Sequence, residues 1–162
     1  MNIFVLDLDQ ARCAQYHCDK HVVKLIVETG QLLCSAHHMA PRGQTPPYRL
    51  THKNHPAAIW TRSGIENYRW LATLGMELCK EYTYRYGRPG KQTHKTQEVI
   101  EWAVDNEPCL PMTSTPFALC MPDTFKCSDP VQSYRQYYCA AKSGFATWTK
   151  RNIPHWFQVQ NK

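Results

Sequence analysis

The chain has 162 residues, 43% of them hydrophobic, and a formal net charge of +6 at pH 7. This length suffices for one domain with its own core, and the apolar share is that of a folded chain, which argues against intrinsic disorder. No run of 18 apolar residues is present, and the start of the chain lacks the basic leader of an export signal. We therefore expect no membrane contact and a cytoplasmic protein, in the host cytoplasm if a phage encodes it.

The first third of the chain predicts a long helix preceded by an extended segment. Residues 2–7 are β-prone and predict one short N-terminal strand or an extended arm. Asp7 or Asp9 is a suitable cap for a helix that starts near Gln10. We expect this helix to continue, with a break near Cys18, to about His38.

The rest of the chain predicts further helices joined by long connections. A short helix starts at Pro56, and Ser63 with Glu66 predicts a capping box for a long helix that ends at 87–90. Further helices are predicted over 93–105 and 130–146, on either side of a proline-rich, irregular stretch. The expected fold class is mainly α, a single compact helical domain over residues 1–162.

Ionisable side chains share one face of the helix around Cys18. At about 100° per residue they fall within a stripe roughly 80° wide. Its members are His17, His21, Lys24, Glu28, Gln31 and Ser35. Burying such groups costs free energy unless they pair or face a cleft, so we interpret the stripe as a catalytic site. The alternative is structural, with a Lys24–Glu28 ion pair beside two buried histidines.

Each catalytic candidate in the stripe has an expected task. Glu28 is the candidate general acid or base, and Lys24 would balance charge or attack as a nucleophile. His17 and His21 would relay protons or position a phosphate. We expect no cofactor, but a divalent metal stays open because His17 and His21 stand four residues apart, a spacing that metal-binding helices use. Third ligands available to such a metal are Glu28, His55 and His94.

Three other segments suggest contact with a polyanion. A polar loop at 51–56 precedes a helix N-terminus, where backbone N–H groups bind anions. Aromatic and basic residues alternate over 81–95 and again over 134–156, a combination used to stack bases and hold phosphates. Core packing or a solvated basic face is the alternative. The expected nucleic-acid or phosphate contacts are Lys20, His52, Asn54, His55, Tyr82, Arg85, Arg88, His94, Lys95, Arg135, Lys150 and Arg151.

Three parts of the chain resemble the phage pyrimidine-dimer DNA glycosylases of the endonuclease V type. The segment 19–33, in which Glu28 follows His21 by seven residues, is similar to the first helix of that family. Residues 55–87 resemble its second long helix, and 146–156 its aromatic, basic C-terminus. The resemblance implies a small all-α protein that excises bases from DNA, with Glu28 as the catalytic carboxylate and His21 as a DNA-contacting histidine.

The nucleophile differs from what the resemblance implies. That family attacks the sugar with an α-amine exposed by removal of the first methionine, whereas Asn2 is bulky for such removal. Val27 and Gln31 stand where the family has arginines. The lyase step would then use another nucleophile, such as Lys24 or a water.

Three hypotheses of function follow. The leading one is a DNA base-excision enzyme of the N-glycosylase kind, acting on a modified or damaged base. The second is a hydrolase or transferase, with or without a metal, acting on a nucleotide or another small phosphorylated substrate. The third is a non-enzymatic phage accessory protein that binds a partner.

Overall fold

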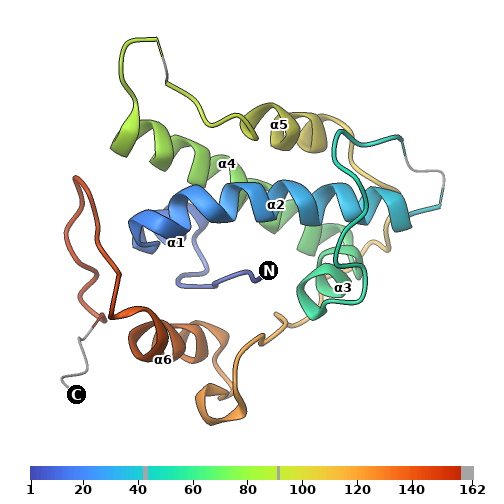
Figure 1. Cartoon of the computed structure of the whole chain (residues 1–162). Coiled ribbons are helices and arrows are strands. Elements are labelled where there is room, and N and C mark those ends of the chain that lie inside the picture. Colours follow the sequence, from blue (N-terminus) through green and yellow to red (C-terminus); the bar gives the residue numbers. More distant parts are fainter. Residues whose placement is uncertain (42–43, 91, 158–162) are drawn as a thin grey trace.

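The computed structural model describes residues 1–41, 44–90 and 92–157, and Figure 1 shows how they are arranged. The described residues form helices and no strand, which confirms the mainly α fold class. The α-helices are α1 (Gln10–Tyr16), α2 (Asp19–Met39), α3 (Pro56–Arg62), α4 (Ile65–Tyr86), α5 (Gln97–Asp105) and α6 (Pro130–Lys142), with a short 3-10 helix η1 (Asp123–Phe125) before α6. None of the described helices is long and apolar enough to span a membrane.

The expected break near Cys18 separates α1 from α2. The Asp9 carboxylate caps α1 by accepting a hydrogen bond from the Arg12 backbone N–H, and His17 and Cys18 have extended backbone between the two helices. Residues 2–7 form no strand but an extended arm that Figure 1 shows between α2 and α6. Its residues 3–6 are buried, so the arm is part of the core.

Helix boundaries differ from the prediction where local signals misled. The capping box at Ser63 is wrong, because Gly64 is the N-cap of α4 and the Ser63 hydroxyl donates to the Ile59 carbonyl of α3. Helix α4 ends before Gly87, as expected. Helices α5 and α6 are both shorter than predicted, beginning at residue 97 and ending at residue 142 respectively.

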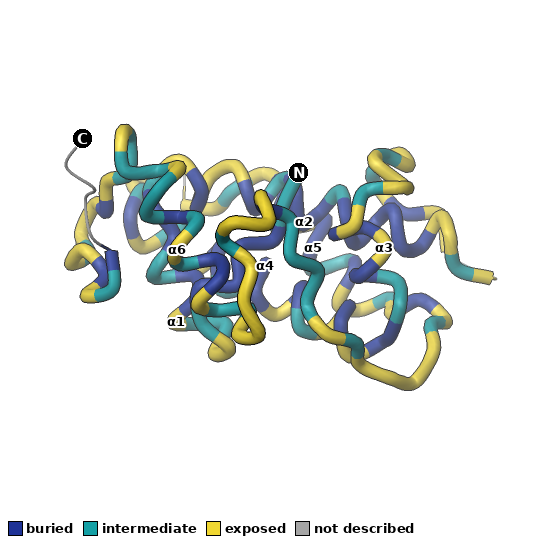
Figure 2. Tube along the Cα trace, turned by 90° about the horizontal axis from the view of Figure 1, so that it is seen from below, coloured by how far each residue is buried: buried dark blue, intermediate teal, exposed yellow. Residues whose placement is uncertain are grey.

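The two long helices, α2 and α4, form the centre of the structure. Helices α1, α3 and α5 pack against them, and α6 lies on the other side of the N-terminal arm (Figure 1). Figure 2 shows buried residues recurring along α2 and α4, whereas the connections are largely exposed. A Cβ at Gly75 of α4 would lie 2.7 Å from the Thr29 methyl of α2, so glycine lets these helices approach closely beside Glu28.

Candidate active site

A cavity of about 270 Å³ lies between the N-terminal arm, α2 and α6. It is small but polar, and several of its lining groups can carry charge. Its lining residues are Met1, Asn2, Phe4, His21, Lys24, Leu25, Glu28, Cys120, Tyr137 and Lys142. The structure therefore brings three residues of the predicted stripe, His21, Lys24 and Glu28, to one cavity.

Glu28 is the only carboxylate that lines this cavity among the described residues. Its Oε2 accepts a hydrogen bond from the Asn2 backbone nitrogen at 3.0 Å and lies 3.7 Å from the α-amine of Met1. Its Oε1 lies 3.3 Å from Lys24 Nζ, one helical turn away. The Glu28 side chain is 10% exposed and the Lys24 side chain 68% exposed. A shielded carboxylate therefore stands between two primary amines.

His21 stands on the same helix face, with its ring held on two sides. Phe4 of the N-terminal arm stacks on the imidazole at a centroid distance of 4.8 Å. The Nδ1 of His21 is 2.7 Å from the Tyr138 hydroxyl of α6. Burial, together with the nearby charges of His17, Lys142 and Lys24, lowers the pKa of His21 to about 3. The ring that lines the cavity is therefore neutral at physiological pH.

His17 lies outside the cavity. It is completely buried, and its Nδ1 donates to the Cys13 carbonyl at 2.6 Å. Its Nε2 is buried without a hydrogen-bond partner among the described residues. The pKa of His17 falls to about 4, mainly because burial disfavours the charged ring. In the part of the chain that the structure describes, no three His, Cys, Asp or Glu side chains come close enough to hold a metal ion.

The predicted contacts nearest the cavity are on α2 and the loop before α3. Lys20 is exposed, with its Nζ over the Phe145 ring at 4.8 Å. His55 caps α3 by accepting from the Ala57 N–H, and its pKa is lowered by burial and then by the charge of the N-terminal amine. His52 and Asn54 are exposed in the same loop. Of these predicted contacts, Lys20, His52 and Asn54 are therefore accessible to solvent.

The aromatic-basic segments at the end of α4 and in the C-terminal third contain internal ion pairs. Arg85 is 3% exposed, and its guanidinium donates to Asp19, to Glu81 and to the carbonyls of Gln15 and His17. It is therefore not accessible to a DNA phosphate, contrary to expectation, because it joins α4 to the start of α2. Arg151 binds the same Glu81 carboxylate through two hydrogen bonds.

The other predicted contacts in these two segments are partly buried or exposed. Arg135 donates to the Leu6 carbonyl, and its guanidinium lies 5.4 Å from the centre of the Tyr16 ring and 5.1 Å from that of Trp156. Lys150 is exposed, although its Nζ donates to the Tyr84 carbonyl. Tyr82 and His94 are partly buried with their rings 5.0 Å apart. The remaining two, Arg88 and Lys95, are exposed.

Three residues that the sequence reasoning missed also contribute to this site. Asn2, Tyr138 and Lys142 come from the first and last fifths of the chain, and no spacing pattern links them to α2. The one available signal for Lys142 is the basic surplus after Cys120, where six Lys or Arg oppose two acids. Within that surplus, nothing distinguishes Lys142 from the others.

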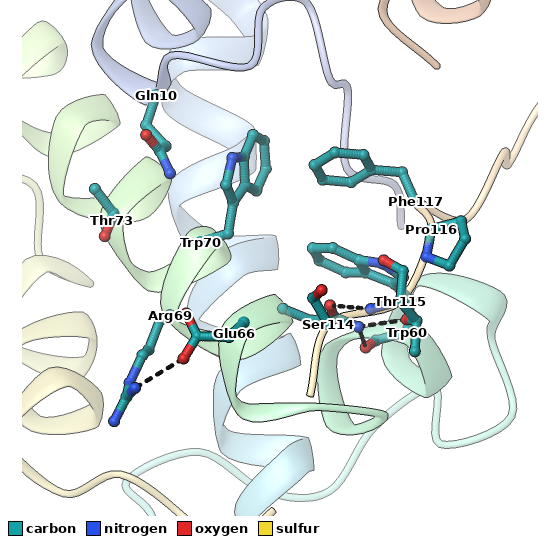
Figure 3. A pocket seen from close by; sticks show the side chains of 11 residues that line it. Gln10, Trp60, Glu66, Arg69, Trp70, Thr73, Ser114, Thr115, Pro116 and Phe117 are labelled. Atoms are coloured by element: carbon teal, nitrogen blue, oxygen red, sulfur yellow. Dashed lines mark hydrogen bonds and ion pairs between the residues drawn. The ribbon is translucent and has the colours of Figure 1, made fainter. Parts of the chain in front are cut away.

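A second cavity, of about 640 Å³, lies beside α3 and α4, and Figure 3 shows its lining. Trp60, Trp70 and Phe117 gather at one end, but both indole N–H groups already donate to backbone carbonyls. Its charged groups, Glu66 and Arg69, pair with each other at 2.9 Å. The charged groups of this larger cavity therefore pair with each other, and we take the smaller cavity around Glu28 as the candidate active site.

Comparison with known proteins places the chain in a family. A search of curated proteins and a search of solved structures gave no match. The family model described as pyrimidine dimer DNA glycosylase matches residues 1–95. This range includes the N-terminal arm, α2 and Glu28. That match covers more than half of the chain, and so the protein belongs to the pyrimidine dimer DNA glycosylase family.

Proposed function

We propose that this protein excises a damaged pyrimidine from DNA, with a cyclobutane pyrimidine dimer as the substrate and Glu28 as the central catalytic group. Membership of a DNA glycosylase family supports the reaction class. The observation that carries the proposal is the position of the Glu28 carboxylate, 3.0 Å from the Asn2 nitrogen and 3.7 Å from the Met1 amine. A carboxylate there can take a proton from an attacking amine and stabilise positive charge on the sugar.

The proposed reaction is a displacement at the sugar. The nitrogen lone pair of an amine forms a bond to C1′, while the C1′–N glycosidic bond breaks and its electron pair leaves with the base. Glu28 accepts the proton that the attacking amine loses, and the departing base takes up a proton. The sugar ring then opens: the C1′–O4′ bond breaks, O4′ takes up a proton, and the nitrogen lone pair forms the second bond of an imine between C1′ and the protein amine.

Two amines are within reach of Glu28, and their environments favour one of them as the nucleophile. Lys24 Nζ extends towards solvent, whereas the Met1 side chain is 2% exposed, which keeps the N-terminal amine beside the shielded carboxylate. Removal of Met1 would convert the Asn2 nitrogen, already 3.0 Å from Glu28, into the reacting amine. We therefore propose the N-terminal amine as nucleophile, with Lys24 as a neighbouring cation.

The test uses a duplex with one cyclobutane pyrimidine dimer and compares the wild type with Glu28→Gln. We expect the variant to bind the duplex but to lose turnover by about 10² or more, as loss of a general acid–base group does. Glu77→Gln is the matched control, because Glu77 also pairs with a lysine, Lys80, on a long helix but does not line the cavity. Full activity of Glu28→Gln, or no cleavage by the wild type, would refute the proposal.

The identity of the nucleophile has its own assay. Borohydride reduces an imine to a stable amine, so it links DNA covalently to the attacking nitrogen. Peptide mass spectrometry of the linked protein should then find the DNA on the N-terminal residue, whether that is Met1 or Asn2. DNA found on Lys24 would assign the nucleophile to α2 instead, and no linkage would favour attack by water.

A further inference from the structure

The Asn2 side chain ties the start of the chain to a segment more than a hundred residues away. Its Nδ2 donates a hydrogen bond to the Cys120 carbonyl at 3.0 Å. Its Oδ1 accepts a hydrogen bond from the Ile3 backbone N–H at 2.8 Å. Only this orientation of the amide places its nitrogen on an acceptor and its oxygen on a donor. Both ends of the Asn2 side chain are therefore held.

Tyr134 of α6 fixes the segment to which Asn2 is bound. Its side chain is completely buried, and its hydroxyl donates to the Ala118 carbonyl at 2.6 Å and accepts from the Cys120 backbone N–H at 3.2 Å. The Cys120 thiol is a further partner of this hydroxyl, and Asn2 Oδ1 lies 3.2 Å from it. Because the Ala118 oxygen is the nearer acceptor, Tyr134 acts on Asn2 mainly by holding residues 118–120 in place.

These contacts matter because the first residues of a chain are poorly ordered unless they are tied down. The Asn2 backbone nitrogen lies 3.0 Å from Glu28 Oε2, and the Met1 amine lies 3.7 Å from the same oxygen. An attacking nitrogen must be aligned with the carbon that it attacks, and a misplacement of about 1 Å can slow a reaction by about 10². The Asn2 side chain is therefore placed to restrain whichever of these two nitrogens reacts.

We propose that the Asn2 side chain, the Cys120 carbonyl and the Tyr134 hydroxyl form a clamp that holds the reacting amine beside Glu28. This inference rests on the proposed function. It gives a role in catalysis to residues that lie beyond 1–95, the range that the family model matches. The Asn2 and Tyr134 side chains are positioning groups, because they act on the sugar only through the place of the amine. Loosening the clamp should slow the attack on C1′ and leave the binding of DNA unchanged.

The kinetic test measures kcat and KM for a duplex with one pyrimidine dimer. Tyr134→Phe removes the hydroxyl without altering the N-terminus, and Asn2→Leu removes the side-chain amide at similar volume. We expect kcat to fall about 10-fold or more in each variant, with KM within about 2-fold of the wild type. Tyr68→Phe is the matched control, because the Tyr68 hydroxyl is equally buried but bonds His37 and the Ala103 carbonyl. This control should keep the wild-type kcat.

A double variant separates positioning from a general loss of structure. Because Asn2 and Tyr134 act through one chain of contacts, Asn2→Leu/Tyr134→Phe should be no more than about 2-fold slower than Asn2→Leu alone. Intact masses establish that the proteins compared begin at the same residue. Losses that multiply in the double variant would overturn the clamp. So would a rise in KM in place of a fall in kcat, or wild-type kcat in either single variant.

The clamp can also be tested in a protein that cleaves nothing. Hydrogen exchange of the Asn2 side-chain amide, followed by nitrogen NMR, reports its bond to the Cys120 carbonyl. Exchange in the wild type should be slower than at the exposed Asn152. Tyr134→Phe should accelerate it, whereas Tyr68→Phe should not. Fast exchange in the wild type would refute the clamp. Slow exchange would support it even in a protein that leaves the dimer intact, an outcome that would refute the proposed function alone.

Discussion

The buried His17 should make the protein lose stability in mild acid. Burial, reinforced by the positive charge of Arg85, lowers the pKa of His17 to about 4, against 6.5 for an ordinary histidine. The folded pKa lies below the unfolded value, so only the unfolded chain takes up a proton as the pH falls from about 6.5 to 4. Stability from this residue is therefore complete above pH 6.5 and is lost towards pH 4.

The size of the effect follows from the two pKa values. Between pH 7 and pH 5, linkage with values of 6.5 and about 4 gives a loss of about 2 kcal/mol from His17 alone. His21 and His37, whose pKa values fall to about 3 and about 4 because of burial, act in the same direction. The protein should thus be markedly less stable at pH 5 than at pH 7.

The contribution of His17 is the difference between the wild type and His17→Asn in how the free energy of unfolding changes with pH. Urea unfolding of the wild type and of His17→Asn is measured at pH 7, 6 and 5. The asparagine amide can replace the hydrogen bond to the Cys13 carbonyl but cannot titrate. Although His17→Asn should be less stable at pH 7, it should lose about 2 kcal/mol less than the wild type on going to pH 5. The exposed His155→Asn serves as the control, and equal losses in the wild type and His17→Asn would refute the reasoning.

Two further predictions concern the buried ion pairs of Arg85 and the salt dependence of DNA binding. Arg85→Met should destabilise the protein by about 3–5 kcal/mol in urea unfolding, because it removes the buried guanidinium that pairs with Asp19 and Glu81, whereas the exposed Arg69→Met should have a much smaller effect. A small effect at Arg85 would show that Arg151 alone satisfies Glu81. The affinity for a DNA duplex should fall steeply between about 50 and 200 mM salt in gel-shift or anisotropy titrations, as counterion release requires, and a flat salt response would contradict contact with DNA phosphates.

The sequence predicted best what depends on neighbours within one helix. The rotation of about 100° per residue places His21, Lys24 and Glu28 on one face, and these three do line one cavity. The break at Cys18 was also predictable, because it depends on residues that are neighbours in the sequence. Periodicity carries no information about depth, however, and so it could not show that His17 is buried behind the cavity.

The parts that failed depend on contacts between distant segments. Arg85 lies in a run of tyrosines and bases that is typical of nucleic-acid binding, but its partner Asp19 is 66 residues away. Tyr138 meets His21 across 117 residues. Pairings of this kind are determined by how the helices pack, and composition or spacing along the chain does not reveal them. The Ser63 capping box failed more locally, because α3 extends far enough to use the serine hydroxyl itself.

The cavity joins residues that the ribosome makes at widely separated times. Glu28 emerges early, whereas the wall that contains Lys142 is translated 114 residues later, which at about 5–20 residues per second means roughly 6–23 s. Until then the carboxylate has no enclosure, and Phe4 lacks the rings of α6 against which it packs. The proposed site around Glu28 is therefore complete only after α6 has been made.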